Sequence, residues 1–93
     1  MTTESDDLRI AELREHGEQA LADAISCYQD RLLRIIDLRL APQLSGRVDA
    51  ADVLQEVFLE ARKRLPRFLR DASVPVFVWL RGVVLDTLVH VHR

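Results

Sequence analysis

The feature that most constrains the fold is a single apolar stripe between residues 50 and 65. Seven apolar residues occur there at offsets of 0, 3, 4, 7, 8, 11 and 15. This spacing places all seven on one face of an α-helix, whereas a strand would alternate its faces. Asp49 precedes the stripe as a favourable N-cap, and Pro66 follows it as the expected end of the helix. The stripe consists of Ala50, Val53, Leu54, Val57, Phe58, Ala61 and Leu65.

A second helix is expected from Glu18 to Leu40, a segment that contains neither Gly nor Pro. Apolar residues recur along it at helical spacing, so the pattern predicts one long helix. The helix is expected to end before Ala41-Pro42, because the residue before a proline is disfavoured in helical geometry. The connector 41–47 contains Pro42, Ser45 and Gly46, which predicts a turn.

The N-terminal segment is strongly acidic compared with the rest of the chain. Residues 1–30 carry a net charge of −6 and residues 31–93 a net charge of +4, within a total of −2. We expect residues 1–7 to be frayed and residues 8–14 to form a short helix that stops at Gly17. The predicted organisation is therefore an acidic lead-in over residues 1–17 and one helical domain over residues 18–93.

The C-terminal segment permits two local structures. It is rich in valine, which favours strands, and a hairpin turning at Arg81-Gly82 is one alternative. The other is a helix capped by Ser73, because five apolar residues fall at offsets of 0, 3, 7, 11 and 14. In either structure Trp79, Leu85 and Val89 lie off the stripe, so a second apolar face is left to meet a partner or a missing part of the protein. The stripe consists of Phe77, Leu80, Val84, Leu88 and Val91.

The composition is that of an ordinary globular domain with one core. The chain has 93 residues, of which 48% are hydrophobic and 30% charged. No apolar run is long enough to cross a membrane, and the acidic N-terminus is unlike a secretory signal. Together these features predict one globular domain, and the single Cys27 fits a reducing, cytoplasmic setting. We expect its core to contain Leu32, Ile35, Val53, Leu54, Val57, Phe58, Phe77, Leu80 and Val84.

No motif predicts catalysis, a metal or another cofactor. His90 and His92 are two residues apart and point in different directions on a helix, so they cannot share one ion. The sequence contains no nucleophile elbow, phosphate-binding loop or zinc-protease motif. Cys27 is the only cysteine in the sequence, and we expect it to be a buried, inert thiol. The protein is therefore expected not to be an enzyme.

The residues with the most information about function lie opposite the apolar stripe. Asp52, Gln55 and Glu56 stand at offsets of 0, 3 and 4, which places them together on one exposed strip. A solvated helix face with an acidic first turn accounts for this pattern. The alternative is a strip of acceptors that docks against arginines of a partner helix.

Three segments resemble one protein family in the family's order. The segment DVLQEVFLEA, residues 52–61, resembles the D-L-V-Q-E-x-F-L-x-A helix of bacterial sigma-70-type factors, especially the extracytoplasmic-function and related small ones. Phe77-Val-Trp79-Leu80 resembles the F-x-x-W-L opening of the family's next helix, and Tyr28 with Leu32 resembles the Y-x-x-x-L part of the preceding one. The resemblance covers residues 20–93, which correspond to sigma region 2. It favours a helix over the hairpin in the C-terminal segment, and it implies a compact all-α bundle of three to four helices.

The resemblance implies a transcription initiation module that binds core RNA polymerase. In the family, this helix holds the clamp helices of the β′ subunit, and the matching positions are Asp52, Gln55 and Glu56. An anti-sigma protein is a further candidate partner. Because the chain stops before the domain that reads the −35 element in the family, we expect a fragment of a longer factor or a truncated relative.

The resemblance also implies contact with the −10 promoter element and its opened non-template strand. The matching positions are Trp79, Arg81 and Arg93, since stacking and positive charge suit single-stranded DNA. A basic run could track phosphates, although solvation of a helix end accounts for it equally well. Trp79 likewise has an alternative role as a plain core residue. The basic run comprises Arg62, Lys63, Arg67 and Arg70, with Arg64 between them.

The last segment departs from the family where DNA contacts are expected. Asp86 stands where the family favours Asn, and Gly82, Leu85 and Thr87 stand where basic or polar residues are common. An acid near phosphates opposes DNA binding. The alternative function is therefore a sigma-like interaction module without promoter reading, which forms a homodimer through its last helix.

Overall fold

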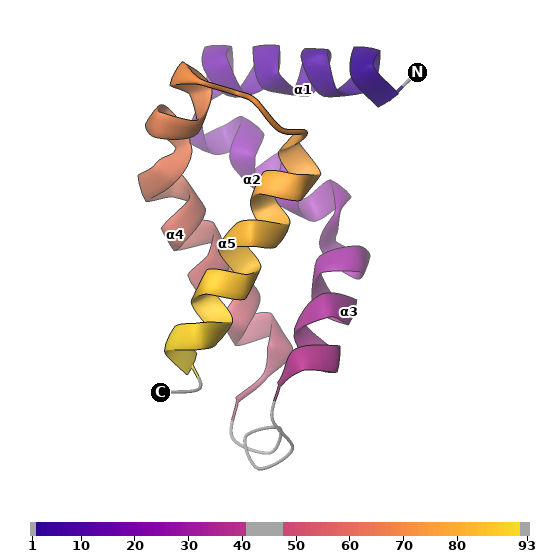
Figure 1. Ribbon diagram of the computed structural model, residues 1–93, viewed down its shortest axis with the longest axis vertical. Helices are drawn as coiled ribbons and strands as arrows, with labels where there is room; N and C mark the ends of the chain where they lie inside the picture. Colours follow the sequence, from indigo (N-terminus) through magenta and orange to yellow (C-terminus); the bar gives the residue numbers. More distant parts are fainter. Residues whose placement is uncertain (1, 41–47, 92–93) are drawn as a thin grey trace.

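Every regular element in the computed structural model, which describes residues 2–40 and 48–91, is an α-helix (Figure 1). The all-α prediction is thereby confirmed, with five helices in these ranges where three to four were expected. The helices are α1 Thr2–His16, α2 Glu18–Cys27, α3 Gln29–Arg39, α4 Ala50–Arg70 and α5 Val76–Val91. The predicted turn over 41–47 lies outside the described residues.

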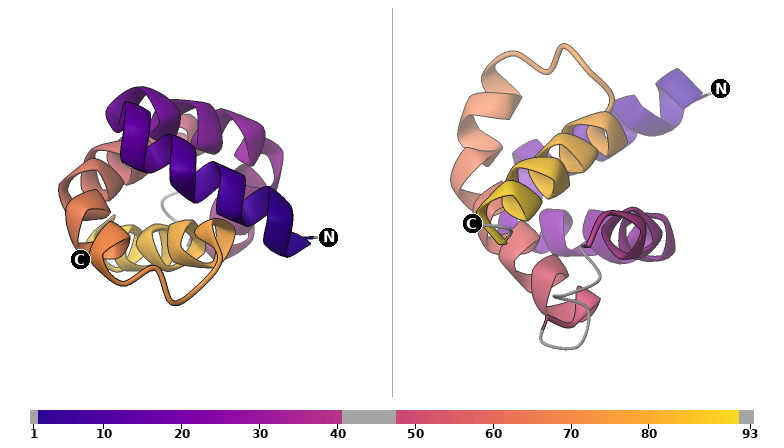
Figure 2. Two further views of the ribbon diagram at one scale, coloured as in Figure 1. Left: turned by 90° about the horizontal axis from the view of Figure 1, so that it is seen from above. Right: turned by 60° about the horizontal axis from the view of Figure 1, so that its bottom comes forward.

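The longest helix, α4, organises the bundle because it contacts each of the other four. Helix α5 packs along α4, and α2 and α3 complete the bundle behind them (Figure 1). Helix α1 lies across one end, as the view from above in Figure 2 shows. The core therefore lies among α2, α3, α4 and α5 and is closed at one end by α1. It consists of Leu13, Ala20, Leu21, Ile25, Leu32, Ile36, Val53, Val57, Ala61, Leu65, Phe68, Val76, Leu80, Val83, Val84 and Leu88.

The apolar stripe of α4 faces this core as predicted. Val53, Val57 and Ala61 are fully buried, and the Asp49 carboxylate accepts a hydrogen bond from the Ala51 N–H at 3.2 Å, which confirms the N-cap. The prediction that α4 ends at Pro66 is wrong, because the helix continues to Arg70. Pro66 is exposed, so water can satisfy the carbonyl group that lacks its donor. The extra turn adds Phe68 to the core.

The single long helix predicted from Glu18 to Leu40 is also wrong. The chain changes direction at Tyr28, which separates α2 from α3 and has φ −98° and ψ 7°. The Tyr28 N–H still bonds to the Ala24 carbonyl, and the Tyr28 carbonyl accepts from Leu32, so the break leaves these groups satisfied. The two shorter helices can each turn an apolar face to α4, which one straight helix could not do.

The C-terminal segment forms a helix, α5, so the helix alternative is confirmed and the hairpin alternative is wrong. Val76, Leu80 and Val84 are fully buried, so strand propensity is overridden by packing on α4. The predicted cap is wrong, because α5 begins only at Val76 and the Val76 N–H donates to the Asp6 carboxylate at 2.9 Å. This acceptor comes from α1, 70 residues earlier in the chain.

The expected fraying of residues 1–7 is contradicted by α1, which begins at Thr2. The contacts that hold α1 in place include the hydrogen bond that Asp6 accepts from α5 and the burial of Leu13, which is 1% exposed. Gly17 ends the helix as predicted, with a φ of 54° that most other residues adopt only with strain. The acidic lead-in is therefore an integral layer of the fold.

Several residues predicted for the core are only partly buried. Phe58 and Phe77 pack against the core without being enclosed by it, and so do Ile35 and Leu54. Truncation of Phe58 should therefore cost less than the ~3–5 kcal/mol of an enclosed phenylalanine. The remaining predicted core residues are buried, namely Leu32, Val53, Val57, Leu80 and Val84.

Replacement of Leu80 by Ala is expected to destabilise the protein by ~2–5 kcal/mol, because the side chain is fully buried and its removal leaves a cavity. Leu38→Ala is the matched control, since Leu38 is 79% exposed on α3, and should change the unfolding free energy by less than ~0.5 kcal/mol. Urea unfolding followed by circular dichroism measures both. Equal losses in the two variants would contradict the assigned core.

Candidate functional site

The acidic strip, defined as Asp52, Gln55 and Glu56, lies exposed on the first half of α4. Its orientation follows from the apolar stripe, because burial of Val53 and Val57 turns the opposite side of the helix to solvent. Within residues 2–40 and 48–91, neither carboxylate of the strip forms an ion pair. The structure therefore brings the three predicted residues together and leaves them accessible.

An apolar hollow of about 390 Å³ borders the strip at Gln55. Leu54 and Phe58 of α4 form one wall, and Ile25 and Leu33 of α2 and α3 form the other. Of these four side chains, Ile25 is buried and the other three are partly exposed. The strip and the hollow together form a surface with acceptors beside an apolar depression.

Two cations of the predicted DNA-binding set are paired with carboxylates. Arg62 Nη1 lies 3.6 Å from Glu18 Oε1, and Lys63 Nζ lies 3.9 Å from Glu60 Oε1. Both cationic side chains are well exposed, so water screens these pairs and each adds little to stability. The pairs nevertheless reduce the local positive charge that a phosphate would meet.

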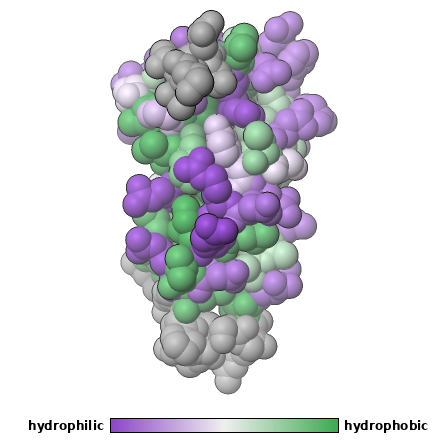
Figure 3. Space-filling view, turned by 90° about the vertical axis from the view of Figure 1, so that its right-hand side faces the viewer, coloured by the Kyte–Doolittle hydropathy of each residue, from purple (hydrophilic) through white to green (hydrophobic). Residues whose placement is uncertain are grey.

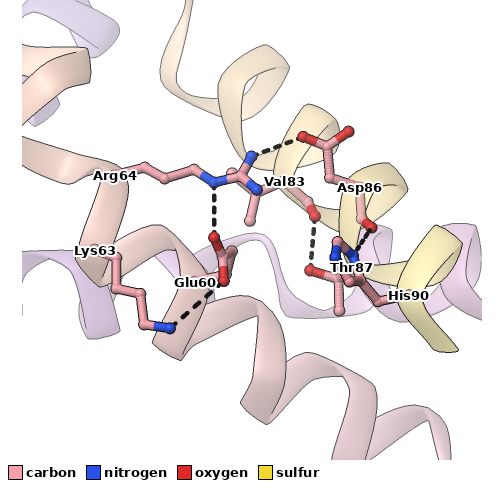
Figure 4. A network of polar contacts seen from close by, with 7 residues as sticks. All are labelled: Glu60, Lys63, Arg64, Val83, Asp86, Thr87 and His90. Atoms are coloured by element: carbon pink, nitrogen blue, oxygen red, sulfur yellow. Dashed lines mark hydrogen bonds and ion pairs between the residues drawn. The ribbon is translucent and has the colours of Figure 1, made fainter.

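Arg64 bonds to two carboxylates, one of which joins α4 to α5 (Figure 4). Its Nε donates to Glu60 at 3.0 Å on the same helix, and its Nη1 donates to Asp86 at 2.7 Å on α5. The hydrogen bond to Asp86 is the main cause that raises the pKa of Arg64, so the guanidinium stays charged. The i, i+4 spacing reveals the pair with Glu60 in the sequence, but no local signal reveals the pair with Asp86.

Trp79 lies flat against Phe68, with ring centroids 4.4 Å apart and planes 9° apart. One face of the indole is therefore taken by α4, and the side chain is only half-buried. Beside this stack lies a hollow of about 430 Å³, lined also by Arg64, Arg67 and Asp71. Trp79 thus contributes to packing and to an accessible aromatic surface near arginine.

The other predicted DNA-binding residues are dispersed. Arg67 and Arg70 are exposed at the end of α4, and Arg81 is exposed on α5. These three form no ion pair with any residue that the structure describes. Of the three, Arg67 lies closest to the aromatic stack, since it shares the hollow with Trp79. Arg93 lies outside the described residues.

A second aromatic cluster was not predicted from the sequence. The Arg31 guanidinium lies 3.8 Å from the centroid of the Phe77 ring, and Phe77 meets Tyr28 edge to face at 5.2 Å. Arg9 covers the Tyr28 ring at 5.0 Å and points its Nη2 at the Cys27 sulfur, 3.4 Å away. The expectation of a buried Cys27 is wrong, because the thiol lies on the exposed side of α2.

Two further features that would bear on function are a metal-binding cluster and a membrane-spanning helix. Among the described residues, His, Cys, Asp and Glu form no group of three or more suited to a metal ion. None of the helices in that part of the chain combines the length and apolarity needed to cross a membrane. Figure 3, which views the molecule from the side of α3, shows hydrophobic residues interspersed with hydrophilic ones.

Comparisons with known proteins do not assign this surface. The chain matched no protein-family model, no curated protein and no solved structure. The surface is therefore interpreted from its own geometry and from the resemblance of its motifs.

A double-mutant cycle on Arg64 and Asp86 should give a coupling energy of ~0.2–1 kcal/mol, as is usual for solvent-exposed pairs. The coupling should shrink in high salt, because both side chains are reached by water. Thermal unfolding of Arg64→Gln, Asp86→Asn and the double variant measures it. A coupling of zero at low salt would show that this contact does not join α4 to α5.

Proposed function

We propose that this chain is a sigma region 2-like module of transcription initiation, which binds the β′ clamp helices of core RNA polymerase and has no catalytic activity of its own. The observation that supports the proposal most is the acidic strip, exposed and free of ion pairs among the described residues, beside an apolar hollow. The order of the three sigma-like segments in the sequence supports it as well. A cytoplasmic location is part of this proposal.

The chemistry of the strip suits a basic helical partner. Asp52 and Glu56 accept hydrogen bonds from arginine in charge-assisted pairs, and Gln55 both donates and accepts. Their spacing along one side of α4 matches side chains one turn apart on a second helix. An apolar side chain of that partner would fill the hollow between Leu33 and Leu54 and so add the buried contact that a polar strip lacks.

The second part of the proposal is contact with the opened −10 DNA. Trp79 and Arg67 share an open hollow, which offers an aromatic edge and a positive charge to an unpaired base and its phosphate. Arg70 and Arg81 carry further exposed charge on α4 and α5. Since Phe68 occupies one face of Trp79, a base would meet the indole from the hollow rather than insert between the rings.

Substitutions in the acidic strip should weaken capture by the isolated β′ clamp helices. Gln55→Ala and Glu56→Lys are each expected to weaken binding about tenfold or more, because each removes charge-assisted or amide hydrogen bonds worth ~1.5–3 kcal/mol. Biolayer interferometry with immobilised clamp helices measures the change. Glu15→Lys, on the exposed side of α1, is the matched control and should bind as the unaltered protein does. Unchanged capture by Gln55→Ala and Glu56→Lys would refute the docking proposal.

Binding to a single-stranded −10 oligonucleotide should depend on salt through the arginines. Arg67→Gln is expected to lower the slope of log K against log salt by ~0.7, the value for one phosphate contact on a single strand. Arg14→Gln removes an exposed arginine of α1 and should leave the slope unchanged. Fluorescence anisotropy of a labelled oligonucleotide gives both slopes. Equal slopes in the two variants would remove Arg67 from the DNA surface.

A further inference from the structure

Helix α5 has two opposite apolar faces, of which only one packs in the core. The inner face carries Val76, Leu80, Val83, Val84 and Leu88, all buried. The outer face carries Val78 and Val89, which are 44% and 54% exposed, together with the half-buried Leu85 and the exposed Gly82. No other described helix covers this face, which points to the front of the molecule in Figure 1. We call Val78, Gly82, Leu85 and Val89 the outer seam.

The spacing of the outer seam is that of a two-helix interface. Its members follow one another at intervals of four, three and four residues, the alternation of a and d positions in a heptad. At the centre, a Cβ added to Gly82 would meet no atom within 4 Å, so the seam has an open notch there. A facing helix can approach closely at the notch and pack its own apolar residues beside it.

The charges on the two sides of the seam indicate which helix fits. Arg81 lies on one side and Asp86 on the other, at the flanking positions that precede and follow the central a and d residues. If two copies pack in parallel about a two-fold axis along the helices, Arg81 of one copy faces Asp86 of the other, twice. If they pack antiparallel, Arg81 faces Arg81 and Asp86 faces Asp86. Charge complementarity therefore selects a second, parallel copy of α5.

The contacts already made by Asp86 leave room for this pairing. Arg64 of the same chain bonds to Oδ2, and the Asp86 side chain remains 58% exposed. Oδ1 can therefore accept from the guanidinium of another molecule. Arg81 is exposed and forms no ion pair with the described residues of its own chain.

We propose that the outer seam of α5 is a homodimer interface, in which two copies pack in parallel and exchange Arg81–Asp86 ion pairs. A seam of four positions is much smaller than a standard interface of ~1,600 Å², so the dimer forms weakly and at high concentration. The seam lies on α5 and excludes the acidic strip of α4, so this proposal does not depend on polymerase binding. Because the dimer covers Arg81, dimerisation and DNA binding at this residue compete.

Sedimentation equilibrium of the full chain from micromolar to millimolar concentration tests the interface. The unaltered protein should show a concentration-dependent dimer, and Val89→Glu should shift its dissociation constant upward by about tenfold or more. Leu38→Glu introduces the same charge at an exposed leucine of α3 and should dimerise normally. A strict monomer at millimolar concentration, or equal weakening by both variants, would overturn the proposal.

A charge exchange tests the parallel arrangement. Arg81→Glu and Asp86→Arg should each dimerise about tenfold more weakly alone, because each converts both attractive pairs into like-charge pairs. Mixing the two variants should restore the affinity, since the mixed dimer regains two opposite-charge pairs. Circular dichroism checks that both variants are folded, and if Asp86→Arg is not, Arg81→Glu alone decides. An antiparallel dimer would leave the self-association of Arg81→Glu unchanged, and that result would refute the parallel pairing.

Discussion

The fold depends on the burial of one apolar stripe of α4. Burial of each valine or leucine of the stripe contributes ~1.5–3 kcal/mol, and the surrounding helices can bury these residues only from one side. Each of the other described helices contacts α4, so packing against several helices fixes the rotation of α4 about its own axis. The exposed position of Asp52, Gln55 and Glu56 is a direct consequence of that packing. The candidate polymerase-binding surface thus lies on the face of α4 opposite the core.

Hydrophobic periodicity predicts the structure correctly where one face of a helix is buried and the other is exposed to solvent. Periodicity predicts that α4 exists and which face of it is buried. Residue type predicts the N-cap of α4 at Asp49 and the end of α1 at Gly17. Both fail where a break or a continuation depends on distant packing. Nothing local in the segment around Tyr28 predicts a change of direction, and Pro66 suggests a helix end although the exposed backbone tolerates it there.

The candidate surfaces were predictable to different degrees for the same reason. The acidic strip lies within five consecutive helical positions, so its geometry follows from the helix alone. The pair between Arg64 and Asp86 and the stack of Trp79 on Phe68 join residues of two helices, and the sequence contains no signal for either. These contacts use part of the basic and aromatic set for structure, and they leave Arg67, Arg70 and Arg81 exposed to a partner.

The hydrogen bond between Asp6 and the first N–H of α5 has a consequence for how the chain acquires its structure. A ribosome releases Asp6 long before it makes Val76, since the two are 70 residues apart. During synthesis the carboxylate therefore remains without this donor, and α1 lacks one of the contacts that position it across the bundle. The hydrogen bond that satisfies the first N–H of α5 can therefore form only after all of the residues between Asp6 and Val76 have been synthesised.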